Sequence, residues 1–570
     1  MYYYSYQNLK RITQTEKGKQ IVEQAKALYE EKFANAPISQ LNYSYQKRFY
    51  IDGNRNLHET LYFLRRQRLN LLQILAIADD AYLEPLEEIL AAICDEFTWT
   101  LPAHLYWNKE EYDYTMIALF SAETGAYLAE TAYIFGDKLS HDIRMRIHLS
   151  IRDKIVQNYE SRTFWWEKTL KNWAAVCACG VGLAYLYAFP ERFDSVKDRL
   201  FSTFESFLNG IDEEGYTSEG VGYWGYGFGF FAVFFDVYTQ LKDECPEFLQ
   251  SEKVLNLVQY LQRAQMQGKV FLPYADGGAR QSNQDWQVLS AIKNLFGDTF
   301  GFAMQPEVKF SARVLGTRLL MAVDKFPYEE EWKVEKQSYY YQNAQVFIHK
   351  NENYAFTAKG GHNAEMHNHN DVGAFQIVKD EKRLICDIGA GEYTRQYFGT
   401  PEERYSIFVR SSLGHSVPII GGKAQGYGKQ YCAKVLEQAD ECFKADIAAA
   451  YNGGVETLIV TYEMQERGVR VHYEAKGLAD KITFRFVSDF QPVIEADGKT
   501  VRVENIMKML NTQGVVPNIS AQAYKGHSYN PKVVETEEGN KVIISNDETA
   551  YTIDYTTTGE SVEMEFYFLF

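Results

Sequence analysis

The strongest constraint on the fold is a change in hydrophobic periodicity just past the middle of the chain. Residues 1 to about 325 place apolar side chains at the spacing of amphipathic helices, most clearly in the segment 59–79. From about residue 344 the apolar runs are short and are separated by turn residues, as in 346–349, which is typical of strands. A charged segment at 326–331 lies between the two patterns. The sequence therefore predicts an all-helical part followed by an all-β part.

A chain of 570 residues is too long for one hydrophobic core, so two or three domains are expected. Helices are predicted at 59–79, 83–94, 114–135, 141–157, 174–189, 193–208, 229–241, 253–266, 286–296 and 311–323. Antiparallel pairs of such helices would form a stacked solenoid or a closed ring. Strands are predicted at 346–349, 354–358, 375–378, 383–388, 469–473, 482–486, 541–544 and 562–568, with a hairpin turn at 380–382. Many short strands of this kind favour a large antiparallel sandwich.

Composition narrows the class of protein and of partner. The net charge of −17 argues against nucleic acid and against an anionic membrane surface. No apolar run has the length of a membrane span, and the N-terminal residues lack the pattern of a secretory signal. The seven cysteines show no paired spacing, which is typical of a reducing compartment, so we expect a cytoplasmic protein. An aromatic content of 15% would suit stacking on sugar rings, although most aromatic side chains belong to a core.

The stretch 362–371 holds three of the eleven histidines. His367 and His369 are two residues apart, so on a strand they would point to the same face. Asp387 and His415 follow later in the chain. Two histidines and one carboxylate form a plausible set of zinc ligands. The alternative is a polar loop whose histidines bond to the backbone.

Two stretches of the helical part also carry candidate chemistry. Residues 165–173 place Asn172 beside lysines and tryptophans, although Asn172 could equally be a helix N-cap. Residues 219–227 contain four glycines among aromatic residues, so a ligand could approach the backbone closely. The alternative there is a glycine-rich loop packed by its own aromatic side chains.

Taken together, these stretches resemble the heparinase II/III-like polysaccharide lyases. The resemblance covers residues 99–415, in the family's order, and lies in Asn172-Trp173, 219–227, 367–371 and 410–415, with 99–104 and 120–125 in support. It implies an N-terminal (α/α) toroid over residues 1–330, an antiparallel β-sandwich over 331–570, and an active site between them. It also implies a carbon-oxygen lyase that cleaves a uronic-acid-containing glycan by β-elimination and leaves a 4,5-unsaturated uronate end.

β-Elimination needs three functions. A donor must neutralise the uronate carboxylate as the enolate forms, a base must remove the C5 proton, and an acid must protonate the leaving oxygen. By resemblance, Asn172 is the neutraliser, Tyr226 is the catalytic tyrosine with Tyr223 as the close second, and His367 is a second base or neutraliser. A free tyrosine has a pKa of roughly 10, so a basic neighbour is needed to favour its phenolate.

The remaining implied residues concern the substrate and the metal. The expected suppliers of positive charge near the tyrosine are Lys168, Lys171, Arg280 and Arg410. The expected substrate-binding residues are Trp173, Glu219, Arg410 and Lys171. The resemblance implies a structural zinc on His369, Asp387 and His415, and no organic cofactor.

Two other readings remain open. A glycoside hydrolase on an (α/α) toroid would need paired carboxylates, for which Glu123, Asp276 and Glu219 are candidates. A carbohydrate-binding protein would keep the aromatic residues without catalysis. For a lyase, a glycosaminoglycan-like substrate is favoured over alginate, and short imported oligosaccharides would fit an acidic cytoplasmic enzyme. Internal or terminal cleavage, and a homo-oligomeric state, are left open by the sequence.

Overall fold

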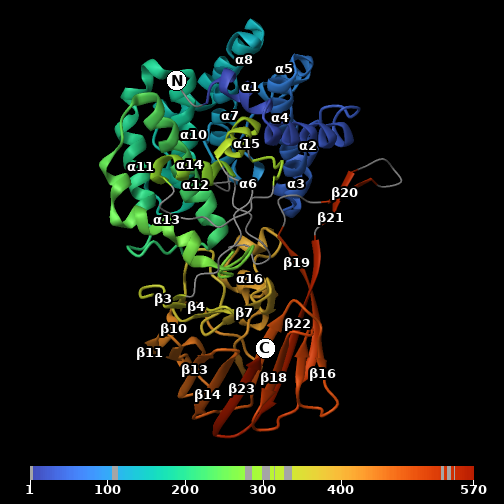
Figure 1. Cartoon of the computed structure of the whole chain (residues 1–570), viewed down its shortest axis with the longest axis vertical. Helices are drawn as coiled ribbons and strands as arrows, with labels where there is room; N and C mark the ends of the chain where they lie inside the picture. The colour runs from blue at the N-terminus through green and yellow to red at the C-terminus, as the bar shows by residue number, and fades with distance from the viewer. Residues whose placement is uncertain are drawn as a thin grey trace.

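The computed structural model describes residues 4–105, 113–276, 286–297, 308–313, 315–325, 337–527, 532–535, 541–544 and 546–570. Its helices gather in one half of the molecule and its sheets in the other (Figure 1). Helices that precede residue 326 form the first half, and the long strands that follow residue 336 form the second. The predicted order of an α part and then a β part is confirmed.

Six helices form a closed inner ring in the helical half. They are α4 (Asn56–Ala78), α7 (Leu119–Phe135), α10 (Asn172–Ala188), α12 (Val221–Lys242), α14 (Trp286–Phe296) and α15 (Gly316–Lys325). Helix α7 packs on α10, α10 on α12, α12 on α14, α14 on α15, and α15 returns to α4. The ring closes between α4 and α7, where Tyr62 bonds to Thr124 and Gln73 donates to Thr131. Helices in this position are enclosed, which explains why α7 and α10 are buried on nearly every side.

A second layer of helices covers the ring. It contains α1 (Tyr6–Thr13), α2 (Glu16–Lys32), α5 (Leu83–Cys94), α8 (His141–Ile151), α11 (Lys197–Asn209) and α13 (Glu252–Ala264). Other helices are α3 (Tyr43–Asp52), α6 (Pro102–Leu105), α9 (Gln157–Ser161) and, within the β half, α16 (Pro401–Tyr405). Paired inner and outer layers around a central core make an (α/α) toroid, as the resemblance implied.

The helix predictions fail in two places. The sequence analysis did not predict α1, α2 and α3. The segment 219–227 was also described as a loop, whereas α12 begins at Val221 and, of the four glycines, only Gly220 stands outside it, at φ 89°. Glycine disfavours helices in isolation, but here close packing explains its presence. A β-carbon at Gly229 would lie 2.5 Å from Val288 on α14, so a larger residue would separate the two helices.

The β half consists of antiparallel sheets in every described pairing. A five-stranded sheet nearest the toroid contains β3 (Gln337–Tyr341), β4 (Val346–Lys350), β5 (Ala355–Lys359), β7 (Phe375–Lys379) and β8 (Lys382–Ile385). Asp380 and Glu381 make the predicted hairpin turn between β7 and β8, both with positive φ.

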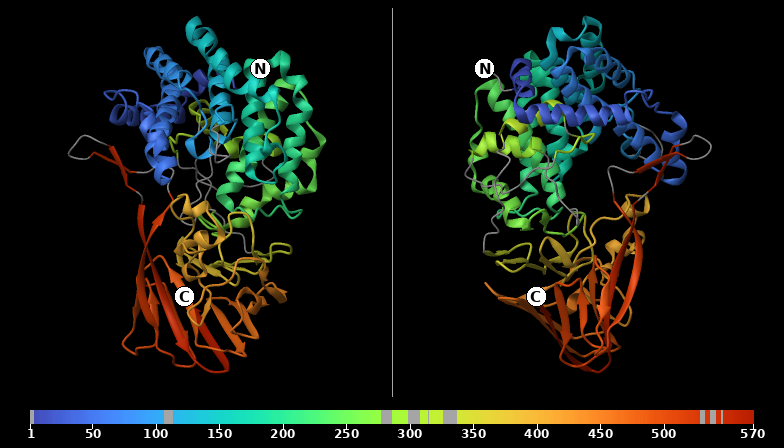
Figure 2. Two further views of the ribbon diagram at one scale, coloured as in Figure 1. Left: turned by 180° about the vertical axis from the view of Figure 1, so that it is seen from behind. Right: turned by 45° about the vertical axis from the view of Figure 1, so that its right-hand side comes forward.

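Two further sheets complete the sandwich (Figure 2). One has the order β11-β12-β13-β14-β23-β18-β17-β16, with bounds Lys434–Ala439, Cys442–Asp446, Thr457–Gln465, Gly468–Lys476, Ser561–Leu569, Met507–Asn511, Val501–Val503 and Pro492–Ile494. The other has the order β19-β22-β15-β9, with bounds Asn518–Gly526, Asn546–Thr557, Ile482–Ser488 and Pro418–Ile420. Phe356 and Phe375 of the five-stranded sheet pack on Tyr462 of the eight-stranded sheet, so these sheets share one apolar core.

Short two-stranded pairs account for the other strands. They are β1 (Gln265–Gln267) with β2 (Val270–Phe271), β6 (His362–Asn363) with β10 (Gly428–Cys432), and β20 (Lys532–Glu535) with β21 (Lys541–Ile544). The predicted domain boundary at 330/331 lies outside the described residues, between the end of α15 and the start of β3. Within the described part of the chain, no helix has the length and apolar character needed to cross a membrane.

Candidate active site

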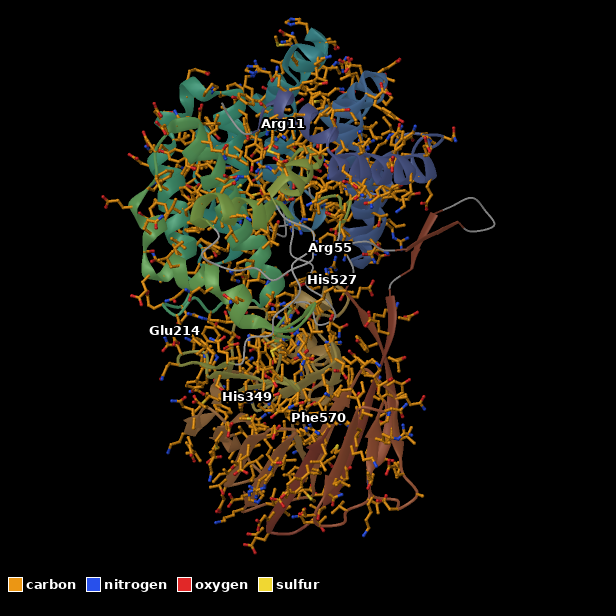
Figure 3. The ribbon with its side chains drawn as sticks, in the orientation of Figure 1. Arg11, Arg55, Glu214, His349, His527 and Phe570 are labelled. Carbon is orange, nitrogen blue, oxygen red and sulfur yellow. The ribbon has the colours of Figure 1, made fainter. Side chains whose placement is uncertain are left out.

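A cavity of about 600 Å³ lies where the two halves meet. The toroid contributes Asn172, Tyr223 and Tyr226 to its wall, and the β half contributes His367 and Tyr393. In Figure 3, the labelled Arg55 and His527, which also line this cavity, lie at the junction of the helices and the sheets. All four predicted catalytic residues therefore face one space, although they come from sequence positions almost two hundred residues apart.

Asn172 and Glu219 form a buried pair on this wall. Asn172 is the first residue of α10, and its Nδ2 donates to both carboxylate oxygens of Glu219, at 3.1 and 3.2 Å. The backbone N–H of Asn172 donates to the same carboxylate at 3.4 Å. Burial raises the pKa of Glu219 above its usual value, against the opposing effects of His367 and Asn172. Glu219 thus has a stronger tendency than a surface glutamate to hold a proton.

Tyr226 lies one helical turn after Tyr223 on α12, and it is held by two charged residues of the toroid. Its hydroxyl donates to Oε1 of Glu123 at 2.7 Å. Arg313 donates to the same oxygen at 3.0 Å, and its guanidinium carbon lies 4.0 Å from the centre of the Tyr226 ring. Burial, followed by the negative charge of Glu123, raises the pKa of Tyr226 well above its usual value, while Arg313 lowers it. The resting side chain is therefore a neutral phenol.

Tyr223 contacts the β half. Its ring stacks on His367 with the centroids 4.1 Å apart. Its hydroxyl shares a hydrogen bond of 2.8 Å with the hydroxyl of Tyr393. Tyr223 thus bridges the two halves directly across the cavity.

Asp276 orders the histidines of the 362–371 stretch. It accepts from Nδ1 of His367 at 2.6 Å and from Nε2 of His369 at 3.0 Å, and the hydroxyl of Tyr397 donates to it as well. Burial would raise the pKa of Asp276, but the bonds from the two histidines outweigh it, and the pKa lies well below its usual range. His367 itself has φ 51°, a conformation uncommon for a residue with a side chain, and it turns Nε2 toward Glu219 at 3.6 Å.

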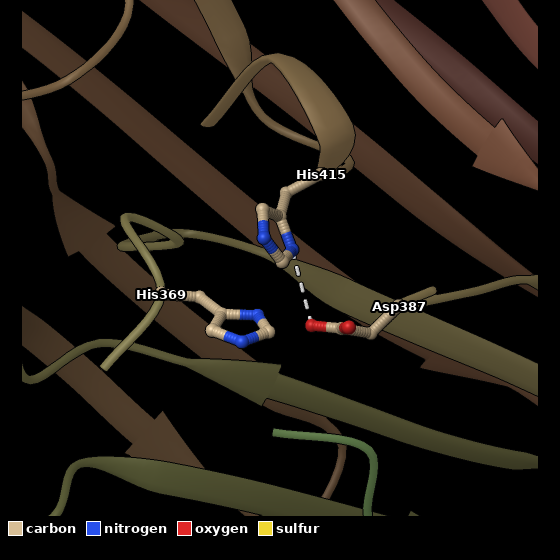
Figure 4. Close-up of side chains that lie close together, drawn as sticks. All are labelled: His369, Asp387 and His415. Carbon is tan, nitrogen blue, oxygen red and sulfur yellow. Dashed lines mark ion pairs between the residues drawn. The ribbon is translucent and has the colours of Figure 1, made fainter. Parts of the chain in front are cut away.

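His369, Asp387 and His415 come together as a buried cluster behind this site (Figure 4). One ligand atom from each lies within 4.8 Å of the others. Nδ1 of His369, Oδ2 of Asp387 and Nδ1 of His415 are buried and make no hydrogen bond, although the last two lie 3.0 Å apart as an ion pair. Buried polar atoms without partners are rare, so these three fit a metal ion.

The outer nitrogens of both histidines support this assignment. Nε2 of His415 lies 3.0 Å from the carbonyl of Val409, and Nε2 of His369 lies 3.0 Å from Asp276. With each Nε2 donating its proton, each Nδ1 keeps a lone pair that points into the cluster. A second hydrogen bond of this kind is the usual way in which proteins orient metal-binding histidines.

The cavity is positively charged despite the acidity of the whole chain. Its described wall carries three acids, Glu59, Glu219 and Glu392, and six cationic side chains, which are Arg55, Lys171, Arg313, Arg395, Arg404 and Arg410. Such a local excess attracts an anionic ligand in spite of the net charge of −17. Lys168 does not line the cavity, and Arg280 lies outside the described residues.

Arg410 has a largely structural set of contacts. It is buried, and its guanidinium donates to the carbonyl of Asn368 at 2.6 and 3.1 Å and to the carbonyl of Tyr397 at 3.1 Å. It therefore joins the histidine loop to the loop that carries Tyr397, while one side of it reaches the cavity. Lys171 is exposed at the cavity rim.

An aromatic wall stands beside Asn172. Trp173 contacts Trp165 and His104, each with ring centroids 4.8 Å apart, and His104 stacks on Phe120 at 5.7 Å. Burial lowers the pKa of His104 to about 3, so it is a neutral ring at neutral pH. Flat apolar faces of this kind suit the C–H face of a sugar ring.

Sequence reasoning missed three contributors to this site. Arg313, whose guanidinium lies over the Tyr226 ring, stands near the start of the predicted helix 311–323 and has no motif around it. Tyr393 stands in an irregular stretch. Asp276 was considered only as a hydrolase acid, because nothing in the sequence links it to residues 367 and 369.

No family model matches the sequence, and no curated protein matches it either. Solved structures do match the fold. Heparinase III matches with a TM-score of 0.58 and 13% identity, over 98% of this chain and 91% of that chain. A heparan sulfate lyase mutant from Pedobacter heparinus matches with a TM-score of 0.55 and 11% identity, over 98% and 91%. The chondroitin AC lyase of Streptomyces coelicolor A3, in complex with chondroitin sulphate, matches with a TM-score of 0.57 and 10% identity, over 99% and 82%.

At this level of identity the similarity concerns the fold. It extends over nearly the whole chain, so both halves and their order are shared with these structures. The chain is thus an (α/α) toroid followed by antiparallel β-sheets, which is the architecture that the sequence analysis expected.

Proposed function

We propose that this chain is a polysaccharide lyase that cleaves uronic-acid-containing glycans by β-elimination. The observation that carries the proposal is the convergence of three braced groups on one cationic cavity. They are the Asn172–Glu219 pair, Tyr226 on Glu123 and Arg313, and His367 on Asp276. The fold shared with lyases of heparan sulfate and chondroitin supports the same class of reaction.

Asn172 and Glu219 neutralise the uronate carboxylate in this scheme. The C5 proton is a poor acid as long as the adjacent carboxylate keeps its full charge, because the enolate would carry a second charge. Burial raises the pKa of Glu219, which favours the protonated carboxyl group that can donate a hydrogen bond to the substrate. Asn172 fixes the position of that carboxyl group through its amide.

His367 is the base in this scheme. With its Nδ1–H donated to Asp276, Nε2 keeps a lone pair on the cavity side. A carboxylate behind an imidazole fixes the tautomer and stabilises the charge that the ring gains. His367 takes the C5 proton, and the electron pair of that C–H bond forms the C4–C5 double bond.

Tyr226 is the acid in this scheme. Its raised pKa keeps the proton on the phenol at neutral pH. As the bond from C4 to the glycosidic oxygen breaks, the oxygen takes its electron pair and receives the Tyr226 proton. Arg313 beside the ring then stabilises the phenolate. Tyr223, stacked on His367, is the second candidate for the acid and otherwise holds the imidazole in place.

The substrate class follows from charge and from the similar structures. A cavity with six cationic side chains fits a polyanionic glycan. The structures of similar fold include lyases named for heparan sulfate and chondroitin, so we assign a glycosaminoglycan-like chain as the substrate and alginate-type oligosaccharides as the second choice. Trp173 and Lys171, which line the cavity, are the proposed contacts to its sugar rings and its acidic groups.

Zinc is the proposed occupant of the His369–Asp387–His415 cluster. Two imidazole nitrogens and one carboxylate oxygen are ligands that zinc accepts readily. The metal would be structural, because it would tie three loops together behind the site. No step of the reaction requires it.

This geometry supports a glycoside hydrolase less well than a lyase. Of its three candidate carboxylates, Glu219 alone lines the cavity among the described residues. Glu123 bonds to Arg313 and Tyr226, and Asp276 bonds to two histidines and Tyr397. A pair of free carboxylates across a glycosidic bond, which hydrolysis requires, is not formed by these residues.

Mass spectrometry of the products separates the two reactions. A lyase splits a glycosaminoglycan oligosaccharide into two fragments whose masses sum to that of the substrate, whereas a hydrolase adds the mass of one water. Fragments that carry the extra water would overturn the lyase proposal. A carbohydrate-binding protein would yield no fragments.

A further inference from the structure

One loop of the β half crosses the cavity wall and bonds to the toroid. We call this loop, residues 390–399, the strap. Its base is fixed to the end of β19, where Gly391 pairs with Gly526 and the backbone N–H of Glu392 donates to Lys525 at 3.0 Å. Tyr393 of the strap stacks on His527 with the centroids 3.8 Å apart. The strap is therefore a supported structure rather than a free loop.

Three contacts join the strap to the helical half. Tyr393 bonds to Tyr223 through their hydroxyls. Asn56, at the start of α4, donates to Oε1 of Glu392 at 3.0 Å. Arg395 donates to the carbonyls of Phe49 and Tyr50 at 2.9 and 3.3 Å. Glu392 and Arg395 also line the cavity, so these contacts form its wall on this side.

The Arg395 contact adds to the packing of α3 on α4 and α6. Phe49 and Tyr50 belong to the last turn of α3, where carbonyl groups lack donors further along the helix. The carbonyl of Phe49 also accepts from the backbone N–H of Gly53 at 3.0 Å. A cationic side chain at this end of a helix satisfies those carbonyls and complements the helix dipole. None of the side chains of α3 is fully buried, and Tyr43 and Ile51 are 64% and 69% exposed. Arg395 is thus one of the groups that anchor α3 to the rest of the molecule.

On the other side of the cavity the two halves are also bonded. Asn343 donates to Asp212 at 2.8 Å, and Lys350 donates to the carbonyl of Gln265 at 3.1 Å. In Figure 1, β3 and α13 lie on the opposite flank from α3 and β19. A glycan chain cannot be laid sideways into a cavity that is bridged on both flanks. It has to enter by an end unless one bridge opens.

We propose that the strap and α3, joined by Arg395 to α3 and by Glu392 to Asn56, make this protein act on chain ends instead of internal bonds. The inference rests on the proposed lyase function and deepens it. Removal of the two contacts frees α3 and opens the flank, so that internal segments of a polymer can bind. Arg395 and Asn56 are then specificity-determining residues.

The test compares early products from a polymeric glycosaminoglycan, separated by size and detected through the ultraviolet absorbance of the unsaturated uronate. Wild type should release one small unsaturated product from the first time point, with the polymer mass falling slowly. The Asn56→Ala/Arg395→Ala double variant should yield intermediate sizes early. Arg48→Ala is the matched control, because Arg48 lies on α3 and forms an ion pair with Asp52 of the same helix. It should retain the wild-type product pattern.

Early intermediate sizes from wild type would overturn the proposal, and so would an unchanged small product from the double variant. Hydrogen exchange gives a second readout that does not depend on turnover. Amides of α3 should exchange faster by about tenfold or more in Arg395→Ala than in Arg48→Ala, and equal exchange would contradict the anchoring role. If no variant makes any absorbing product while the exchange difference is present, the lyase function fails and the strap contact stands.

Discussion

Asp276 accepts a hydrogen bond of 2.6 Å from Nδ1 of His367, and the imidazole lies between this carboxylate and the cavity. The contact joins the two halves, because Asp276 follows β2 of the toroid and His367 belongs to the β half. It leaves Nε2 as the nitrogen that faces a substrate. The position of the proposed base therefore depends on a residue that never touches the glycan.

Replacement of Asp276 by asparagine tests this dependence. An amide can donate to the imidazole and stabilise the wrong tautomer, so kcat should fall by roughly 10²-fold or more while KM changes little. The measurement is steady-state kinetics with a defined oligosaccharide, with the melting temperature as the check on folding. A Tyr397→Phe variant, which removes another bond to the same carboxylate, is the control and should lose less activity. A larger loss in the control would refute the role of Asp276.

Glu219 predicts a distinct dependence on pH. If the neutral carboxylic acid is the active form, activity of the wild type should fall as pH rises through its raised pKa. Glu219→Gln keeps a neutral donor, so its profile should lack that decline. The measurement is kcat/KM against pH for both proteins. An unchanged decline in the glutamine variant would assign the titration to another group.

The raised pKa of Glu219 also predicts how the stability of the folded state changes with pH. At a pH below the unfolded-state pKa, roughly 4.3, Glu219 is protonated in both the folded and the unfolded state, so folding buries no charge. As the pH rises above that value, the unfolded state releases its proton first, so the folded state loses stability until the folded pKa is passed. The melting temperature of Glu219→Gln should therefore exceed that of wild type by a margin that grows with pH and then levels off. A margin that shrinks with pH would contradict the raised pKa.

The His369–Asp387–His415 cluster predicts a stabilising metal. Removal of the ion with a chelator would leave buried polar atoms without partners, at a cost of roughly 1–3 kcal/mol each. The melting temperature should fall on chelation and recover with zinc, and elemental analysis should find one metal per chain. His415→Ala should be insensitive to the chelator. His349→Ala, which alters a buried histidine elsewhere in the β half, should stay sensitive. If the melting temperature of wild type were equally insensitive to the chelator, the cluster would not bind a stabilising metal.

The sequence was sufficient to predict the architecture because the two hydrophobic periods are strong and are separated along the chain. The inner helices α4 and α10 and the hairpin of β7 and β8 follow from these patterns. The helical start of α12 could not be predicted from these patterns, because its glycines disfavour a helix locally. Packing against α14 and α10 explains their presence. The outer helix α3 was missed because it has no buried face to produce a periodic pattern.

The candidate site was predictable in its motifs but not in its contacts. The clustering of Asn172, Tyr226 and His367 in one cavity agrees with the resemblance, while their catalytic roles stay predictions. The partners that brace them, Arg313 and Asp276, arrive from distant parts of the chain through the closure of the toroid and its docking on the β half. No local sequence pattern marks such residues, so only the three-dimensional structure reveals them.

The most direct test of the lyase account is ultraviolet absorbance over time with glycosaminoglycan oligosaccharides. Wild type, Tyr226→Phe and Tyr223→Phe should be compared at equal concentration and equal folded fraction. The account predicts an absorbance rise for wild type, a loss of roughly 10²-fold or more for Tyr226→Phe, and a smaller loss for Tyr223→Phe. The reverse order would transfer the acid role to Tyr223. New reducing ends without any rise in absorbance, from wild type, would contradict β-elimination itself.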